Sequence, residues 1–306
     1  MTRGLILALA IEGVILAALM TVAADQIAHS RVEKLGGVNV WGYRGPVLHQ
    51  KKGNEVRIAV TGGDLAFGWG VAASETLAPS VSHLLSVRLD LPGPNARLVT
   101  GVTTAARGLP PGAYARWIEH YAYLRPDVIC LVPDPVGHVL ADPTFLPDRR
   151  SMAFRMFGYS PILPLVLDEK GTLVHSALLR LAGQMLDRAD GLTSGRSDQS
   201  RGTVVGLADY ATSIDAAVRA ALRSTTAGVV VVLAPANDNG GVKTQLASAL
   251  GGERVRLVDL GDDPRMIDAG LRLDGFSFSV GGHSVAGQNV APAVLDVIDR
   301  AGLREP

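Results

Sequence analysis

The sequence contains almost no cysteine and no excess of charge of either sign. Cys130 is the one cysteine among 306 residues, so no intrachain disulfide can form and no site with cysteine metal ligands is expected. Lysine and arginine number 29, and aspartate and glutamate also number 29, with no basic cluster. Proteins that bind the phosphate backbone of nucleic acids carry a basic patch. We therefore expect no nucleic-acid partner.

The glycine-rich loops of nucleotide-binding proteins are also missing. The segments GGVNVWG and GGDLAFGWG are rich in glycine, but neither matches GxGxxG or GxxxxGK[ST]. No His and Cys residues are spaced as metal ligands. We therefore expect no cofactor and no bound metal.

One long hydrophobic run lies at the N-terminus, over residues 4–24. At about 1.5 Å per residue, a helix of this length crosses the hydrocarbon core of a bilayer once. The insertion gain from its Leu, Ile and Val residues exceeds the cost of about 3 kcal/mol for its one charge, Glu12. A cleaved signal peptide is the alternative, because Val22-Ala23-Ala24 before Asp25 resembles a cleavage site. The run is longer than the core of a typical signal peptide, so we predict an uncleaved anchor.

Small residues accompany Glu12 along one stripe of this predicted helix. Ala10, Gly13, Ala17 and Ala24 recur at spacings of three, four and seven residues. Small residues let a second helix approach closely, and a carboxylate finds a partner more easily in a protein interface than in lipid. Glu12, Gly13 and Ala17 are therefore candidates for contact with a transmembrane helix of a second copy or of a partner protein. A protonated Glu12 tolerated by an otherwise apolar helix is the alternative.

Five short hydrophobic runs alternate with helical patterns after residue 55. The runs are nearly continuous in apolar character, as expected of strands buried on both faces. The predicted strands are residues 56–60, 97–101, 127–132, 228–233 and 254–258. The predicted helices are residues 76–89, 111–124, 207–226, 242–250 and 284–302. This alternation predicts a three-layer α/β/α sandwich with a five-stranded, mainly parallel sheet of the flavodoxin-like kind, preceded by one transmembrane helix.

The same pattern divides the chain. Residues 1–24 form the predicted anchor, and residues 25–55 a juxtamembrane lead-in with a short helix followed by extended chain. The α/β domain is predicted over residues 56–303. Within it, residues 138–205 break the rhythm of strands and helices, so we interpret them as an insertion over the carboxyl edge of the sheet.

Three segments together resemble the SGNH (GDSL-type) hydrolase and esterase family, in particular its membrane-anchored bacterial members. They are the lead-in GYRGP at residues 42–46, the turn TGGDLAFGWGV at residues 61–71, and the closing segment DGFSFSVGGH at residues 274–283. The resemblance runs from about residue 39 to residue 300. It implies an α/β/α fold with a catalytic site at the carboxyl edge of the sheet, and a bacterial inner-membrane protein whose domain faces the extracytoplasmic side. Secretion after signal cleavage is the alternative location.

The catalytic motifs of that family are degenerate in this chain. The family uses a serine nucleophile, a histidine base oriented by an aspartate, and an oxyanion hole built from the N–H of the serine, a glycine and an asparagine. Alignment of the FGWG segment places Asp64 at the serine position and Thr104 at the glycine position. The segment ending at Pro135 replaces GxND and contains no asparagine, and Ser277 stands at the histidine position. Asp274 alone keeps its identity.

These departures predict a domain that has lost acyl transfer. An aspartate at position 64 has no hydroxyl to activate, and Ser277 cannot act as a base at neutral pH. Asp64 and Asp274 facing each other could hold a metal or share a proton, although single loop carboxylates are more often structural. His283 is expected to cap or pack the last helix. We therefore expect a binding or accessory domain for a glycan, an acylated molecule or a protein partner. An active esterase with rearranged catalytic residues is the alternative.

Overall fold

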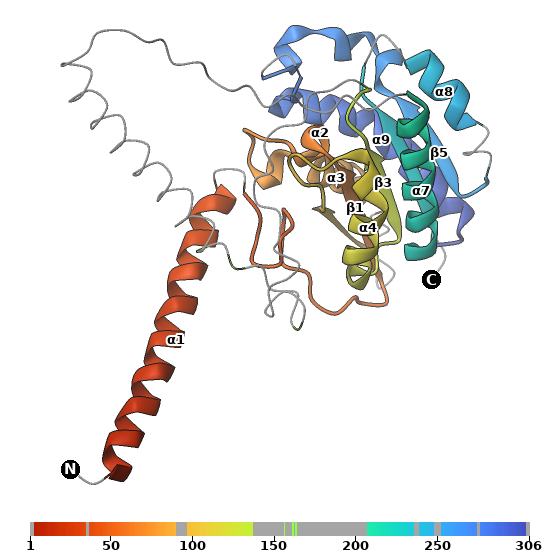
Figure 1. The fold of residues 1–306 in the computed structure, drawn as a ribbon. Coiled ribbons are helices and arrows are strands. Elements are labelled where there is room, and N and C mark those ends of the chain that lie inside the picture. The colour runs from red at the N-terminus through yellow and green to blue at the C-terminus, as the bar shows by residue number, and fades with distance from the viewer. Residues whose placement is uncertain are drawn as a thin grey trace, which may run out of the picture. The chain divides into compact units, whose positions relative to one another are not determined.

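The structure is a computed structural model, shown as a ribbon in Figure 1. It describes residues 3–34, 37–89, 97–136, 156, 161, 163, 207–235, 239–247, 252–273 and 276–303. Contacts divide the chain into two units: one contains Met1–Val32 and Pro147–Arg201, and the other contains Glu33–Leu146 and Gly202–Pro306. The predicted insertion at 138–205 lies outside the described residues, apart from residues 156, 161 and 163.

The N-terminal helix is longer than the predicted anchor. Helix α1 spans Arg3–Lys34 without a break, so the predicted juxtamembrane helix continues the hydrophobic one. Its segment Gly4–Ser30 has a mean hydropathy of 2.5 and is long and apolar enough to cross a membrane. Large apolar side chains along it are exposed, among them Leu7, Leu16 and Leu19. An apolar helix with an exposed surface is consistent with either a membrane anchor or a signal sequence.

The second unit is built on a five-stranded sheet in which every strand pairing is parallel. Its strands are β1 (Glu55–Gly62), β2 (Leu98–Thr103), β3 (Val128–Val132), β4 (Gly228–Leu233) and β5 (Val255–Asp259). They lie in the order β2-β1-β3-β4-β5. This order is that of flavodoxin-like folds, in which the chain reverses its winding direction between β1 and β3. The predicted five-stranded sheet is confirmed.

Helices cover both faces of the sheet (Figure 1). Helices α3 (Leu77–Leu89) and α9 (Val280–Arg300) pack together over one face, and α4 (Tyr114–His120) and α7 (Leu207–Ser224) over the other. Alternate strand residues enter the two cores: Ile58 and Val60 contact the core under α3 and α9, whereas Ala59 belongs to the core under α4 and α7. Two shorter helices, α2 (Asp64–Phe67) and α8 (Asn239–Ala247), follow β1 and β4. The predicted three-layer sandwich is therefore present.

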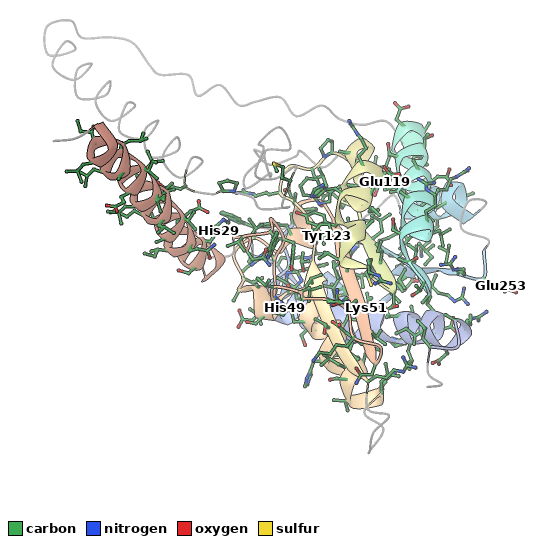
Figure 2. The ribbon with its side chains drawn as sticks, turned by 90° about the horizontal axis from the view of Figure 1, so that it is seen from below. His29, His49, Lys51, Glu119, Tyr123 and Glu253 are labelled. Atoms are coloured by element: carbon green, nitrogen blue, oxygen red, sulfur yellow. The ribbon has the colours of Figure 1, made fainter. Side chains whose placement is uncertain are left out.

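Buried ion pairs hold the lead-in against the amino edge of the sheet. Asp127, just before β3, accepts hydrogen bonds from the Arg57 backbone at 2.8 Å and from Lys51 Nζ at 2.5 Å (Figure 2). The Arg57 guanidinium pairs with Glu55 at 2.8 Å and donates to the Leu124 carbonyl at 2.9 Å. These charged groups satisfy one another, as buried charges must. Ligand sites in parallel α/β sheets lie at the opposite, carboxyl edge, so the candidate site is sought there.

Candidate functional site

The turn after β1 requires glycine at two consecutive positions. A Cβ atom at Gly62 would lie 1.9 Å from the Val132 carbonyl oxygen, and one at Gly63 would lie 2.0 Å from Asp134 Oδ2. Neither contact is tolerable for a side chain, and the first is with backbone. The two glycines therefore let the end of β1 and the start of α2 lie directly against the loop after β3.

A buried arginine from the lead-in fixes the far end of the same turn. Arg44 pairs with Thr103 through the backbone, and its guanidinium donates to the carbonyls of Phe67, Gly68 at 2.7 Å and Val71 at 2.5 Å. A cation at the carboxyl end of α2 complements the partial negative charge of those carbonyls. This contact links two of the segments that carry the family resemblance, GYRGP and FGWGV.

Asp64 is buried as the first residue of α2. Its Oδ1 accepts a hydrogen bond of 2.7 Å from the Gly108 backbone, in the loop after β2. The aligned position carries the nucleophilic serine in the SGNH family. Here the side chain accepts a hydrogen bond from the Gly108 N–H of the neighbouring loop and has no hydroxyl for attack.

Asp134 bonds to the start of α2, a role that the sequence did not predict. Its Oδ2 accepts from the Asp64 backbone N–H at 3.0 Å, and its Oδ1 accepts from the Leu65 N–H at 2.9 Å. The Asp134 side chain is almost completely buried. In the family, the N–H at the nucleophile position stabilises the negative oxygen of the tetrahedral intermediate. Here an oxygen of the Asp134 side chain accepts that N–H.

Two tyrosines hold the backbone of Asp134 in this position. The Asp134 N–H lies 3.4 Å from the Tyr114 hydroxyl, and the Tyr210 hydroxyl donates to the Asp134 carbonyl at 2.8 Å. Burial, and then the nearby Asp134 charge, raise the pKa of both Tyr114 and Tyr210 above the usual range. Both phenols stay protonated at neutral pH, so neither can act as a general base there.

Thr104 also has a structural role. Its hydroxyl lies 2.5 Å from that of Thr61 and 3.3 Å from the Val60 carbonyl, and its own carbonyl accepts from Trp117 Nε1. The side chain therefore joins the ends of β1 and β2. The aligned glycine of the family instead contributes to the oxyanion hole.

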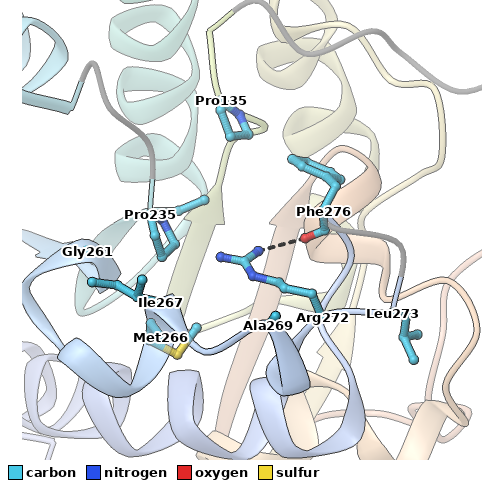
Figure 3. Close-up of a pocket in the computed structure, with 10 residues that line it drawn as sticks. Pro135, Pro235, Gly261, Met266, Ile267, Ala269, Arg272, Leu273 and Phe276 are labelled. Carbon is cyan, nitrogen blue, oxygen red and sulfur yellow. Dashed lines mark hydrogen bonds between the residues drawn. The ribbon is translucent and has the colours of Figure 1, made fainter.

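The closing segment is described in part. Ser277 is buried, and its carbonyl accepts from the Leu273 N–H at 2.9 Å. Asp274 lies outside the described residues, so the expected pairing of Asp64 with Asp274 stays untested. Pro135 and Phe276 line one cavity, so the segment that carries Ser277 lies beside the loop after β3 (Figure 3). Among the described residues, no group of three or more His, Cys, Asp or Glu is arranged to hold a metal.

His283 packs inside the domain, as expected. Its ring is fully buried with its centroid 5.5 Å from that of Phe278, and neither ring nitrogen has a hydrogen-bond partner among the described residues. Burial, together with the charge of Arg44, lowers the pKa of His283 to about 3. A neutral, enclosed ring of this kind does not exchange protons with a substrate at neutral pH.

The candidate contacts of the N-terminal helix all lie on α1. Glu12, Gly13 and Ala17 are exposed, and a Cβ atom at Gly13 would meet nothing within 4 Å. The space that a second helix would need is therefore available at Gly13. Contact with another transmembrane helix stays a prediction.

No protein-family model and no curated protein matches this chain. Solved structures do. A mutant acetyl esterase with an acetate ion matches with a TM-score of 0.43 and 11% identity, over 80% of this chain and 99% of the other. A carbohydrate esterase family 3 protein from Talaromyces cellulolyticus matches with a TM-score of 0.42 and 12% identity, over 80% of this chain and 99% of the other. The family 3 carbohydrate esterase of Clostridium thermocellum matches with a TM-score of 0.40 and 12% identity, over 80% and 98%.

The chain has a five-stranded parallel sheet flanked by helices on both faces. With identities of 11–12% and TM-scores of 0.40–0.43, these matches assign the chain to no family and to no activity. Activity has to be argued from the residues at the carboxyl edge.

Proposed function

We propose that this protein is a membrane-anchored, catalytically inactive SGNH-like domain that acts as a binding or accessory domain on the extracytoplasmic side. The observation that carries this proposal is the Asp134 carboxylate, which accepts the backbone N–H groups of Asp64 and Leu65. In the alignment that the family resemblance implies, an active member would stabilise a developing oxyanion at this position.

The electrostatic consequence is severe for acyl transfer. Oxyanion stabilisation depends on N–H donors that await a negative charge, and the loss of one donor costs about 10²–10³ in kcat. At this edge two donors are already bonded to the Asp134 side chain. An oxyanion formed here would meet a carboxylate, and like charges at such short range repel.

The other expected catalytic positions also support an inactive domain. Asp64 has no hydroxyl, Thr104 bonds to Thr61, and Ser277 replaces the histidine base. Removal of the catalytic triad alone costs many orders of magnitude in rate. The fold, the Gly62-Gly63 turn and its Arg44 clamp are nevertheless intact, which favours a domain kept for binding.

The anchor is part of the proposal. Helix α1 has the length and hydropathy of a membrane-spanning segment, and it continues beyond the small residues that resemble a cleavage site. We infer that residues 1–24 stay attached and hold the domain at the membrane. Ligands consistent with the fold are a glycan or an acylated molecule.

The proposal can be tested with a fluorophosphonate probe, which labels activated serines covalently. The full chain in detergent should stay unlabelled, at the level of its heat-denatured sample, while a serine esterase added to the same sample is labelled. Labelling of the folded chain that maps to one serine would support the active-esterase alternative and overturn the proposal.

A further inference from the structure

The lead-in enters the α/β domain a few residues after the membrane-spanning segment. Helix α1 ends at Lys34, and Val38 is already buried in the core under α3 and α9. A chain rises about 1.5 Å per residue as a helix and at most about 3.6 Å per residue when extended. Val38 therefore lies within about 20 Å of Ser30, where the apolar segment ends. With an uncleaved anchor, this short connection keeps the entry point of the domain close to the bilayer surface.

The entry point packs against the turn that follows α4. The Tyr121 hydroxyl donates to the Gly42 carbonyl at 2.6 Å. The Arg57 guanidinium then joins the two segments, because it donates to the His49 carbonyl at 2.6 Å and to the Leu124 carbonyl at 2.9 Å. His49 precedes β1 and Leu124 precedes β3, so these contacts gather the lead-in and the turn at the amino edge of the sheet.

The outer surface of these two segments combines exposed apolar and basic side chains. Val47 is 41% exposed, and Tyr123, whose ring centroid lies 6.1 Å from that of Tyr121, is 49% exposed. Lys52 and Arg125 are exposed as well, and neither pairs with a carboxylate among the described residues. We call this surface the lead-in face and define it by five exposed residues: Val47, His49, Lys52, Tyr123 and Arg125.

The charge that is left unpaired around this face is basic. Within the described residues 37–57 and 111–127, every acidic residue has a basic partner: Glu55 with Arg57, Asp127 with Lys51, and Glu119 with Arg223. An anionic bilayer surface attracts exposed lysine and arginine side chains. Tyrosine favours the headgroup region, because its ring is apolar and its hydroxyl is polar. The lead-in face thus has the charge and the aromatic content of a surface that contacts anionic lipid.

We propose that the lead-in face rests on the anionic lipid surface of the membrane that holds α1, so that the carboxyl edge of the sheet points away from the bilayer. The inference rests on the retained anchor of the proposed function and adds an orientation to it. The lipid surface is favoured over a separate protein because the chain itself brings this face to the membrane. Strand β1 has eight residues, so the two edges of the sheet lie about 25 Å apart. A ligand of the carboxyl edge would therefore arrive from solution and not from within the bilayer.

Quenching of a fluorescent label by lipid tests this orientation in the full chain, reconstituted in nanodiscs that contain phosphatidylglycerol. Cys130 is buried, and burial raises the pKa of its thiol to about 12, so it does not react with a maleimide in the folded protein. Val47→Cys carries the label on the lead-in face. Asp209→Cys carries it at the exposed start of α7, which lies at the carboxyl edge because α7 leads back to the start of β4. A nitroxide on the lipid headgroup should quench the label at position 47 more strongly by about twofold or more, because about 25 Å of sheet separates the two edges.

Charge reversal tests the basis of the contact. Lys52→Glu combined with Arg125→Glu should lower the quenching at position 47 to the level found at position 209. Arg219→Glu on the exposed surface of α7 is the control and should leave the quenching unchanged. Nanodiscs of phosphatidylcholine alone should reproduce the effect of the double variant, since they carry no net negative charge. If the double variant fails to fold, this comparison of lipids still decides.

Equal quenching at positions 47 and 209 would overturn the orientation and leave the lead-in face for a protein partner. Quenching at position 47 that is the same in anionic and neutral nanodiscs would also overturn it. The result is separable from a failure of the proposed function, because the intact mass of the reconstituted protein shows whether the anchor is present. Absent quenching with an intact anchor removes the orientation alone, whereas a chain that begins at Asp25 removes the anchor and the orientation together. The fluorophosphonate result is independent of both.

Discussion

At the scale of single residues, the Asp134 side chain holds the turn after β1 and carries the proposal of an inactive domain. It accepts the N–H groups of Asp64 and Leu65 at the start of α2. A charged acceptor at a helix start stabilises the local structure. Under the proposed function, the same contact occupies the position where an oxyanion would be held, so one contact would both stabilise the turn and prevent acyl transfer.

Replacement of Asp134 by alanine should therefore destabilise the domain. Two buried N–H groups would lose their acceptor, and each costs about 1–3 kcal/mol, so we expect a loss of about 2–4 kcal/mol in the free energy of unfolding. Asp209→Ala on the exposed side of α7 is the matched control. It should lower the free energy of unfolding by only a few tenths of the Asp134→Ala loss. Urea titration with proteolytic sensitivity as the readout measures the free energy of unfolding of both variants. Equal, small effects would mean that Asp134 does not hold the turn.

His283 allows a second prediction, on pH. Its pKa is about 3 in the folded protein and about 6.5 when exposed. Between pH 6.5 and pH 3, the His283 ring therefore binds a proton in the unfolded chain but stays neutral in the folded chain. The folded state loses stability as the pH falls through this range.

His283→Leu should remove that part of the pH dependence. Between pH 7.5 and pH 5, the variant should gain about 2 kcal/mol relative to the unmodified protein, at about 1.4 kcal/mol per pH unit below 6.5. Unfolding free energies at the two pH values provide the measurement. A parallel pH dependence in the two proteins would show that the ring is protonated in the folded state.

The role of Asp134 could not be read from the sequence. The motif VPDP indicated only that the asparagine of the family is missing. The partners of the carboxylate lie 69 and 70 positions earlier in the chain, and a lone aspartate between two prolines carries no signal for them. The one available hint was its place directly after a buried strand, where polar side chains gather in parallel sheets.

At the scale of elements, the strands were predictable because they are buried on both faces. The predicted run 228–233 coincides with β4, and the other predicted strands overlap the observed ones. Helix ends were less accurate. Helix α9 begins at Val280 rather than 284, since the Ser279 hydroxyl caps it by accepting from the Gly282 N–H at 3.2 Å.

The predicted helix at 111–124 was also wrong in detail. The chain forms short 3₁₀ turns at Pro111–Ala113 and Tyr121–Leu124, on either side of α4. Pro111 stands at the first position, where proline is tolerated, and Arg125 ends the element in the left-handed region at a φ of 52°.

The contact between the β1 turn and the β3 loop gives a prediction at this scale. Gly62→Ala would place a Cβ atom against the Val132 carbonyl and force β1 and β3 apart, so we expect a loss of about 2–3 kcal/mol or failure to fold. Gly53→Ala is the control, because its Cβ atom would meet nothing within 4 Å. Thermal unfolding of the two variants should differ clearly, and similar midpoints would contradict the described approach of the two strands.

At the scale of the whole molecule, the proposed function combines a membrane segment with a domain that binds without turnover. The hydrophobic run predicted a membrane-crossing helix, and α1 has the required length and hydropathy. Whether the helix is cleaved depends on recognition by a peptidase, which hydropathy alone does not specify.

Retention of the anchor is testable directly. We expect the intact mass of the protein purified from membranes to include residues 1–24, and the protein to resist extraction at high pH, because a span of this length is not released by loss of electrostatic contacts. A soluble product beginning at Asp25 would contradict the anchor. A variant with residues 1–24 replaced by a cleavable signal is the control for release.

The central claim, that the carboxyl edge no longer performs acyl transfer, is tested most directly by hydrolysis of p-nitrophenyl acetate by the purified full chain. We expect its hydrolysis rate to equal that of the Asp64→Asn and Ser277→Ala variants and that of the heat-denatured protein. Saturable turnover in the unmodified protein that disappears in either variant would contradict it.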